Sequence, residues 1–151
     1  MEVKERKELA VKYFTDGYNC AQSVALAFAD LVDIKSETLA KLSSSFGGGM
    51  GRLREVCGAV TGMFMIAGML YGYADGEIGE KKAEHYALIQ ELAKEFEAQC
   101  GSIICRELLD VEGKEEPIPA ERTKEYYKKR PCGELVGIAA EILAKKTEQL
   151  G

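Results

Sequence analysis

The stretch "SFGGGMGRLREVCGAVTGMFMIAGMLYGY", Ser45 to Tyr73, decides the predicted fold. It opens with a glycine loop, Gly47 to Gly51, which should interrupt a helix because glycine is unfavourable inside helices. From Val56 to Ala74 no residue is charged. An uncharged run of this length suits either a membrane span or a helix buried at the centre of a bundle.

The remaining segments favour the buried helix, so no membrane span is expected. They are amphipathic, and each needs a partner to cover its apolar face. The sequence therefore predicts a single all-α domain over residues 1–151, a bundle of about six to eight helices around the glycine-rich apolar helix, without β-alternation of useful length. The expected helices cover Val3–Thr15, Cys20 to about Val32, Ser36 to about Phe46, Glu55–Tyr73 and Glu80–Cys100, with a shorter one near Cys105 and a last one after Pro131.

Composition narrows the class of protein. The chain has 151 residues and a net charge of -5, with 30% charged and 46% hydrophobic residues, as expected for one globular domain. Its only compact basic cluster is "YYKKRPC", Tyr126 to Cys132, so no nucleic-acid partner is expected. The N-terminal segment has no apolar signal core, so we expect a cytoplasmic protein whose cysteines form no permanent disulfides.

Four of the five cysteines stand where helices are expected to begin. Cys20 follows Asn19, a good helix cap, Cys57 follows the glycine loop, and Cys132 follows Pro131. Cys105 comes soon after the break at Gly101. Helix N-termini favour anions, so these positions should lower the pKa of a thiol and raise its reactivity or its affinity for a metal.

The spacing of the cysteines excludes some sites. No Cys-x-x-Cys is present, which argues against a thioredoxin motif and a zinc ribbon. The fifth cysteine, Cys100, belongs to no evident pattern, and its role is left open. The one histidine, His85, lies among charged residues and is expected on a solvated helix face rather than in a site.

Four segments together resemble one known family. They are "GYNCAQSV", "FGGGMGRLREVCGAVTG", "GSIICREL" and "RPCGELV", and they extend over nearly the whole chain. The chain resembles the redox-active C_GCAxxG_C_C family, whose Cys-Gly-Ala-x-x-Gly signature corresponds to Cys57–Gly62. The four-cysteine pattern of the family falls on Cys20, Cys57, Cys105 and Cys132. The resemblance implies redox activity at these cysteines and says little about the reaction.

Three interpretations of the cysteines remain open. Cys20, Cys57, Cys105 and Cys132 could ligate an iron–sulfur cluster for electron transfer, or a zinc ion. Alternatively, two of them, with Cys57 and Cys105 as the first candidates, could exchange electrons as a dithiol without metal. The third possibility is a helical scaffold with inert buried thiols. Whether the protein is an enzyme is left open.

Small and basic residues complete the predicted site. Gly58 and Gly62 should let another backbone, or a cofactor, come close to the helix that begins near Cys57. Arg52 and Arg54 either add positive charge near that cysteine or are simply solvated. An unidentified redox protein is the expected partner, and a homodimer is possible because the apolar helix could exceed what one small bundle buries.

Overall fold

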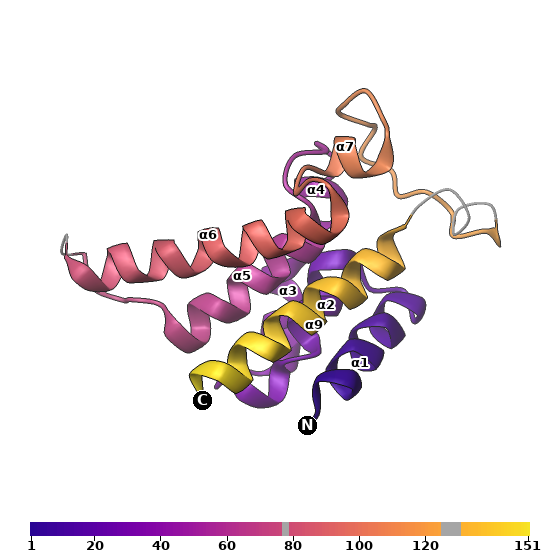
Figure 1. The fold of residues 1–151 in the computed structure, drawn as a ribbon. Helices are drawn as coiled ribbons and strands as arrows, with labels where there is room; N and C mark the ends of the chain where they lie inside the picture. The colour runs from indigo at the N-terminus through magenta and orange to yellow at the C-terminus, as the bar shows by residue number, and fades with distance from the viewer. Residues whose placement is uncertain (77–78, 125–130) are drawn as a thin grey trace.

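A computed structural model describes residues 1–76, 79–124 and 131–151 of the chain (Figure 1). Within these residues the protein consists of helices and connecting segments, and it contains no β-strand. The all-α prediction is therefore confirmed. Most of the basic cluster predicted at Tyr126–Cys132 lies outside the described residues. The elements are α1 (Val3–Thr15), α2 (Cys20–Leu26), the short 3-10 helix η1 (Ala29–Leu31), α3 (Ser36–Ser44), α4 (Gly47–Met50), α5 (Gly58–Tyr71), α6 (Glu80–Cys100), α7 (Cys105–Leu109) and α9 (Cys132–Leu150).

The core lies between α2, α5 and α9, with α1 packed along α9 and α6 crossing α5 (Figure 1). Its largest fully buried side chains include Phe28 of the α2–η1 connection, Met63 of α5 and Leu143 of α9. The apolar helix is thus central, as predicted, but it shares the centre with α9. No helix in the described residues is long and apolar enough to cross a membrane.

The last turn of α5 is less enclosed than the rest of the helix. Gly58 to Met63, Ile66 and Ala67 are buried, whereas Met69 is 47% exposed. This end of α5 and the beginning of α6 extend from the body of the molecule (Figure 1). The homodimer stays a prediction.

Two glycines allow α5 to pack closely against α2. A Cβ atom on Gly62 would lie 2.7 Å from the carbonyl oxygen of Ala21, and one on Gly58 would lie 2.8 Å from that of Phe46. Neither distance is compatible with a side chain unless the backbone moves. The prediction of close helix approach at Gly58 and Gly62 is therefore confirmed.

Several expected boundaries were wrong by a few residues. α2 ends at Leu26 rather than Val32, because the chain turns through η1, and α3 ends at Ser44 rather than Phe46. The apolar helix begins at Gly58 instead of Glu55, since Val56 pairs with Ile104 in an isolated antiparallel bridge. Periodicity cannot detect this bridge, because it joins two distant segments.

Candidate functional site

The segment Gly47–Val56 folds back on itself at one end of the bundle, beside α7. Gly48 and Gly49 have positive φ angles, and so do Arg52 and Arg54. Gly49 also touches the neighbouring segment, since a Cβ there would lie 2.6 Å from Cβ of Cys105. The glycine loop thus lets this turn pack directly against Cys105.

Cys57 and Cys105 lie on two antiparallel segments joined by backbone hydrogen bonds. The N–H of Cys57 donates to Ile103 at 2.8 Å, and the N–H of Cys105 donates to Glu55 at 2.6 Å. Cys57 is the residue that precedes α5, so its thiol lies beside the first N–H groups of that helix, among them those of Ala59 and Val60. The two cysteines are 4% and 6% exposed.

Cys20 and Cys132 form a second pair. Cys20 is the first residue of α2, which is capped by the side chain of Asn19 accepting a hydrogen bond from the N–H of Gln22 at 2.9 Å. Cys132 follows Pro131 and is the first residue of α9. The side chains of Cys20 and Cys132 interact with each other at the cavity. Cys132 is buried, whereas Cys20 is partly exposed.

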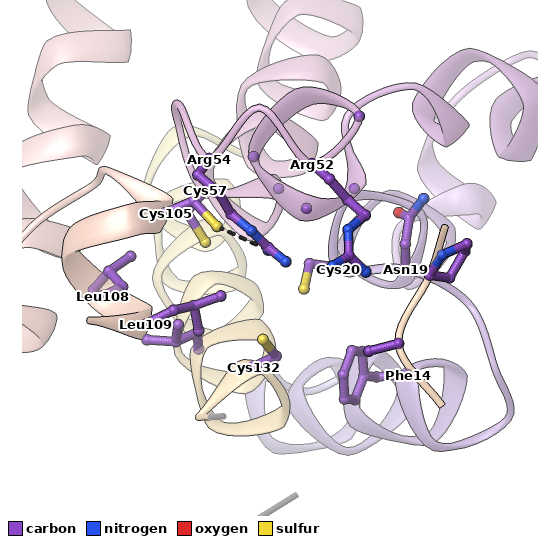
Figure 2. A pocket seen from close by; sticks show the side chains of 18 of the residues that line it. Phe14, Asn19, Cys20, Arg52, Arg54, Cys57, Cys105, Leu108, Leu109 and Cys132 are labelled. Carbon is purple, nitrogen blue, oxygen red and sulfur yellow. Dashed lines mark hydrogen bonds between the residues drawn. The ribbon is translucent and has the colours of Figure 1, made fainter. Parts of the chain in front are cut away.

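All four cysteines of the predicted site line one cavity of about 380 Å³ (Figure 2). Each stands at the start of a helix, as the sequence predicted. The five cysteines are thiols in this structure. Cys100 ends α6 and lies outside the cavity. Gly58 also lines it, whereas Gly62 does not and contacts α2 instead. The four cysteines therefore reach the cavity from four distant parts of the chain.

Positive charge lies next to the thiols. The side chain of Arg54 is 3% exposed, and its Nη1 donates a hydrogen bond to Sγ of Cys105 at 3.5 Å (Figure 2). Its Nε donates to Glu115 at 2.9 Å, and Nη2 of Arg52 donates to the other oxygen of the same carboxylate at 2.7 Å. The interpretation of these two arginines as solvated side chains is therefore wrong.

The described part of the connection between α7 and α9 forms one wall of the cavity. Pro117, Pro119, Ala120 and Arg122 of this connection are among its lining residues. The guanidinium of Arg122 donates hydrogen bonds to the carbonyl oxygens of Phe14 and Tyr18, and it lies 4.2 Å from the centre of the Phe14 ring. We call residues 110–124 the strap.

The pKa of two thiols moves in the direction opposite to the one predicted. The hydrogen bond with Cys132 and then burial raise the pKa of Cys20 well above its ordinary value. Burial raises the pKa of Cys57 to about 12, although the N–H groups of Ala59 and Val60 act to lower it. The helix N-terminus is present, but removal from water outweighs it.

The sequence analysis missed Glu115, Arg122 and the strap. Its only signals there were two prolines in a polar segment, which indicated a connection and not a wall of the cavity. Ion pairs between residues so far apart in the chain leave no local pattern. Only the folded structure brings Glu115 to Arg54.

No carboxylate and no imidazole is found among the described residues that line the cavity. Its possible metal ligands are thus soft sulfur atoms, which suit iron–sulfur clusters or zinc rather than magnesium or calcium. In the described residues no group of three or more His, Cys, Asp or Glu side chains is arranged to hold a metal ion. The metal-ligand set Cys20, Cys57, Cys105 and Cys132 therefore stays a prediction.

Fold and site together define an all-α protein with four cysteines gathered at a cavity near one end of its bundle. Residues 18–146 match the model of the family described as "putative redox-active protein (C_GCAxxG_C_C)". The chain belongs to this family. A search of curated proteins and a search of solved structures found no match.

Proposed function

We propose that this protein transfers electrons through an iron–sulfur cluster held by Cys20, Cys57, Cys105 and Cys132. The observation that carries the proposal is that all four thiols line one cavity, although they come from four separate elements. Packing alone gives no reason for these four to meet while Cys100 lies elsewhere. When bound, an iron–sulfur cluster supplies one-electron transfer, and an electron-carrier protein is the expected partner.

The donor chemistry of the cavity fits such a cluster. The sulfurs come in two pairs, Cys20 with Cys132 and Cys57 with Cys105, and an iron–sulfur cluster spreads its thiolate ligands over several iron atoms. Zinc fits less well, because four sulfurs must then lie about 2.3 Å from one point. No such grouping occurs in the described residues.

The chain also supplies groups that favour negatively charged sulfur. The N–H groups of Ala59 and Val60 point to Cys57, and Arg54 donates to Cys105. Nε of Arg52 is buried without a hydrogen-bond partner in the described residues, so a donor beside the cavity is unused. Because ligation requires thiolates, the raised pKa of Cys57 implies that metal uptake releases protons from the site.

A second candidate function is dithiol exchange, and the contact between Cys20 and Cys132 favours it. A partly exposed cysteine beside a buried one is the arrangement expected of an exchanging pair. Two thiols would form one S–S bond, and their two electrons and two protons would pass to a disulfide of a partner protein. This reaction uses only two of the four patterned cysteines, so we rank it second.

The deciding experiment measures iron, zinc and acid-labile sulfide per chain after anaerobic purification of protein made with ample iron. Near-stoichiometric iron with sulfide supports the cluster. Zinc without sulfide points to a structural metal site instead. Protein that takes up no metal, even after reconstitution with iron and sulfide, contradicts the cluster. A thiol titration after mild oxidation then tests the Cys20–Cys132 disulfide.

A further inference from the structure

We propose that Arg54 is the cation that balances the charge of the cysteine site and raises its reduction potential. The inference rests on the proposed function and assigns a role to a residue outside the cysteine pattern. Its evidence is the placement of one buried guanidinium between a thiol and a carboxylate.

Burial of Arg54 requires an explanation. A charged side chain is costly to remove from water unless it is paired and hydrogen-bonded. Arg54 has both kinds of partner, Sγ of Cys105 at 3.5 Å and Glu115 at 2.9 Å. Glu115 holds the Nε side of the guanidinium, which leaves Nη1 directed to the sulfur. Arg54 is therefore fixed in the site and is not an adaptable surface charge.

The backbone at Arg54 is also constrained. Its φ angle of 61° lies in the left-handed region, where residues other than glycine are strained. Three contacts hold this conformation: the N–H of Arg54 donates to Gly48 at 3.3 Å, and both the N–H and Nη1 of Arg106 donate to the Arg54 carbonyl oxygen at 3.2 Å. Strain that neighbouring contacts maintain is typical of functional positions.

The charges near the cavity do not balance while the thiols are neutral. Among the described residues, three arginines line it, Arg52, Arg54 and Arg122, and no carboxylate does. Glu115, just outside the lining, pairs with both Arg52 and Arg54. The excess of positive charge is matched once the thiols become thiolates around an iron–sulfur cluster.

This placement gives Arg54 a predictable electrostatic effect. One-electron reduction, by a one-electron carrier protein in the cell or by dithionite in the test, adds a negative charge to the site. A buried cation in contact with a ligand sulfur stabilises the more negative form, because the low local dielectric weakens screening. Loss of the charge at Arg54 should therefore make reduction harder and lower the midpoint potential.

The test compares reconstituted wild type with Arg54→Met, Arg54→Lys and Lys4→Gln. Lys4 is an exposed residue in the first turn of α1, whereas Phe14 near the end of α1 lines the cavity, so the Lys4 variant removes one positive charge away from the site. Midpoint potentials are measured by anaerobic redox titration, with iron and sulfide content determined for each protein. We expect Arg54→Met to reduce the one-electron equilibrium constant about tenfold, equivalent to about 59 mV. Arg54→Lys should recover more than half of the shift, and Lys4→Gln should match wild type.

Other outcomes separate this inference from the proposed function. If wild type takes up no iron and sulfide, both fail. If wild type is loaded and loaded Arg54→Met has the potential of Lys4→Gln, only the role of Arg54 fails. Should Arg54→Met fold but lose the cluster, retention by Arg54→Lys supports the requirement for charge. If both variants fold and lose the cluster equally, positive charge is not what the site requires of Arg54, and the inference is overturned in favour of a purely geometric role.

Discussion

Cys20 and Cys132 begin two helices near opposite ends of the sequence, and their side chains interact at one cavity in the folded protein. This contact ties the start of α2 to the start of α9. The second pair, Cys57 and Cys105, is held by backbone hydrogen bonds between two other segments. The cysteine site thus depends on the mutual position of four elements.

Replacement of Cys57 by serine should abolish cluster binding and leave the helices intact. Serine has nearly the same size, but its hydroxyl is a poor ligand for iron. We expect iron and sulfide per chain to fall more than roughly tenfold, with unchanged far-ultraviolet circular dichroism. Cys100→Ser is the matched control, because Cys100 lies outside the cavity. Wild-type iron content in Cys57→Ser would show that this cysteine is not a ligand.

Gly62→Ala should destabilise the fold, whereas Gly68→Ala in the same helix should not. A Cβ on Gly62 would meet the carbonyl oxygen of Ala21 at 2.7 Å, but none of the surrounding atoms lies within 4 Å of a Cβ on Gly68. Overpacking costs about 1–3 kcal/mol, while an unobstructed glycine-to-alanine change inside a helix gains about 0.5–1 kcal/mol. Urea unfolding of both variants measures the difference. Equal midpoints would contradict a tight contact between α2 and α5.

Alkaline pH should destabilise the reduced, metal-free protein through Cys57. Burial raises the folded pKa of this thiol to about 12, from an ordinary value of 9.0. Below the ordinary value both states hold the proton. As pH rises between these two values, the unfolded state loses the proton and the folded state keeps it, so the free energy of unfolding falls by up to about 1.4 kcal/mol per pH unit.

Urea unfolding under reducing conditions with a chelator, at about pH 8 and about pH 10, tests this expectation. Cys57→Ser is the control, because its hydroxyl does not titrate there. The loss of stability at the higher pH should be larger for wild type than for Cys57→Ser. Equal losses would indicate that Cys57 has no raised pKa in the folded state.

Arg122→Ala should release the strap and expose the thiols without unfolding the bundle. Arg122 donates hydrogen bonds to the carbonyl oxygens of Phe14 and Tyr18, and hydrogen bonds of charged groups contribute about 1.5–3 kcal/mol. Loss of one such contact raises the fraction of molecules in which the strap is released roughly tenfold or more. The rate of Cys20 alkylation in metal-free protein, followed by mass spectrometry, measures this opening.

Lys124→Ala is the matched control for the strap, because Lys124 is an exposed neighbour of Arg122. Its alkylation rate and its unfolding midpoint should both equal those of wild type. A rate in Arg122→Ala that equals the control would show that this anchor does not limit access to the cavity.

The sequence predicted the helices well because their signals are local. α1 and α6 have the predicted bounds, since apolar periodicity, charged faces and the glycine at the end of α6 all lie within each segment. The four cysteines at helix starts were predicted for the same reason, from flanking asparagine, glycine and proline residues. The predicted helix boundaries were wrong where a residue contacts a distant segment of the chain, as at Val56, which pairs with Ile104.

Only some properties of the site could be predicted from the sequence. The cysteine set and the close approach at Gly58 and Gly62 could be inferred, but the direction of the thiol pKa could not. A helix N-terminus lowers a thiol pKa by a local interaction, whereas burial depends on everything packed around the sulfur. At Cys57 burial prevails, and no sequence pattern reports it.

The sequence alone determined that the chain forms amphipathic helices around a glycine-rich apolar one and that four cysteines begin helices. Short-range backbone and side-chain preferences specify these features. The tertiary structure alone decided that the four thiols line one cavity, that Arg54 contacts Cys105, and that Glu115 and Arg122 hold the strap beside it. These are contacts between residues far apart in the chain, and they form only when packing of the whole core fixes the helices relative to one another.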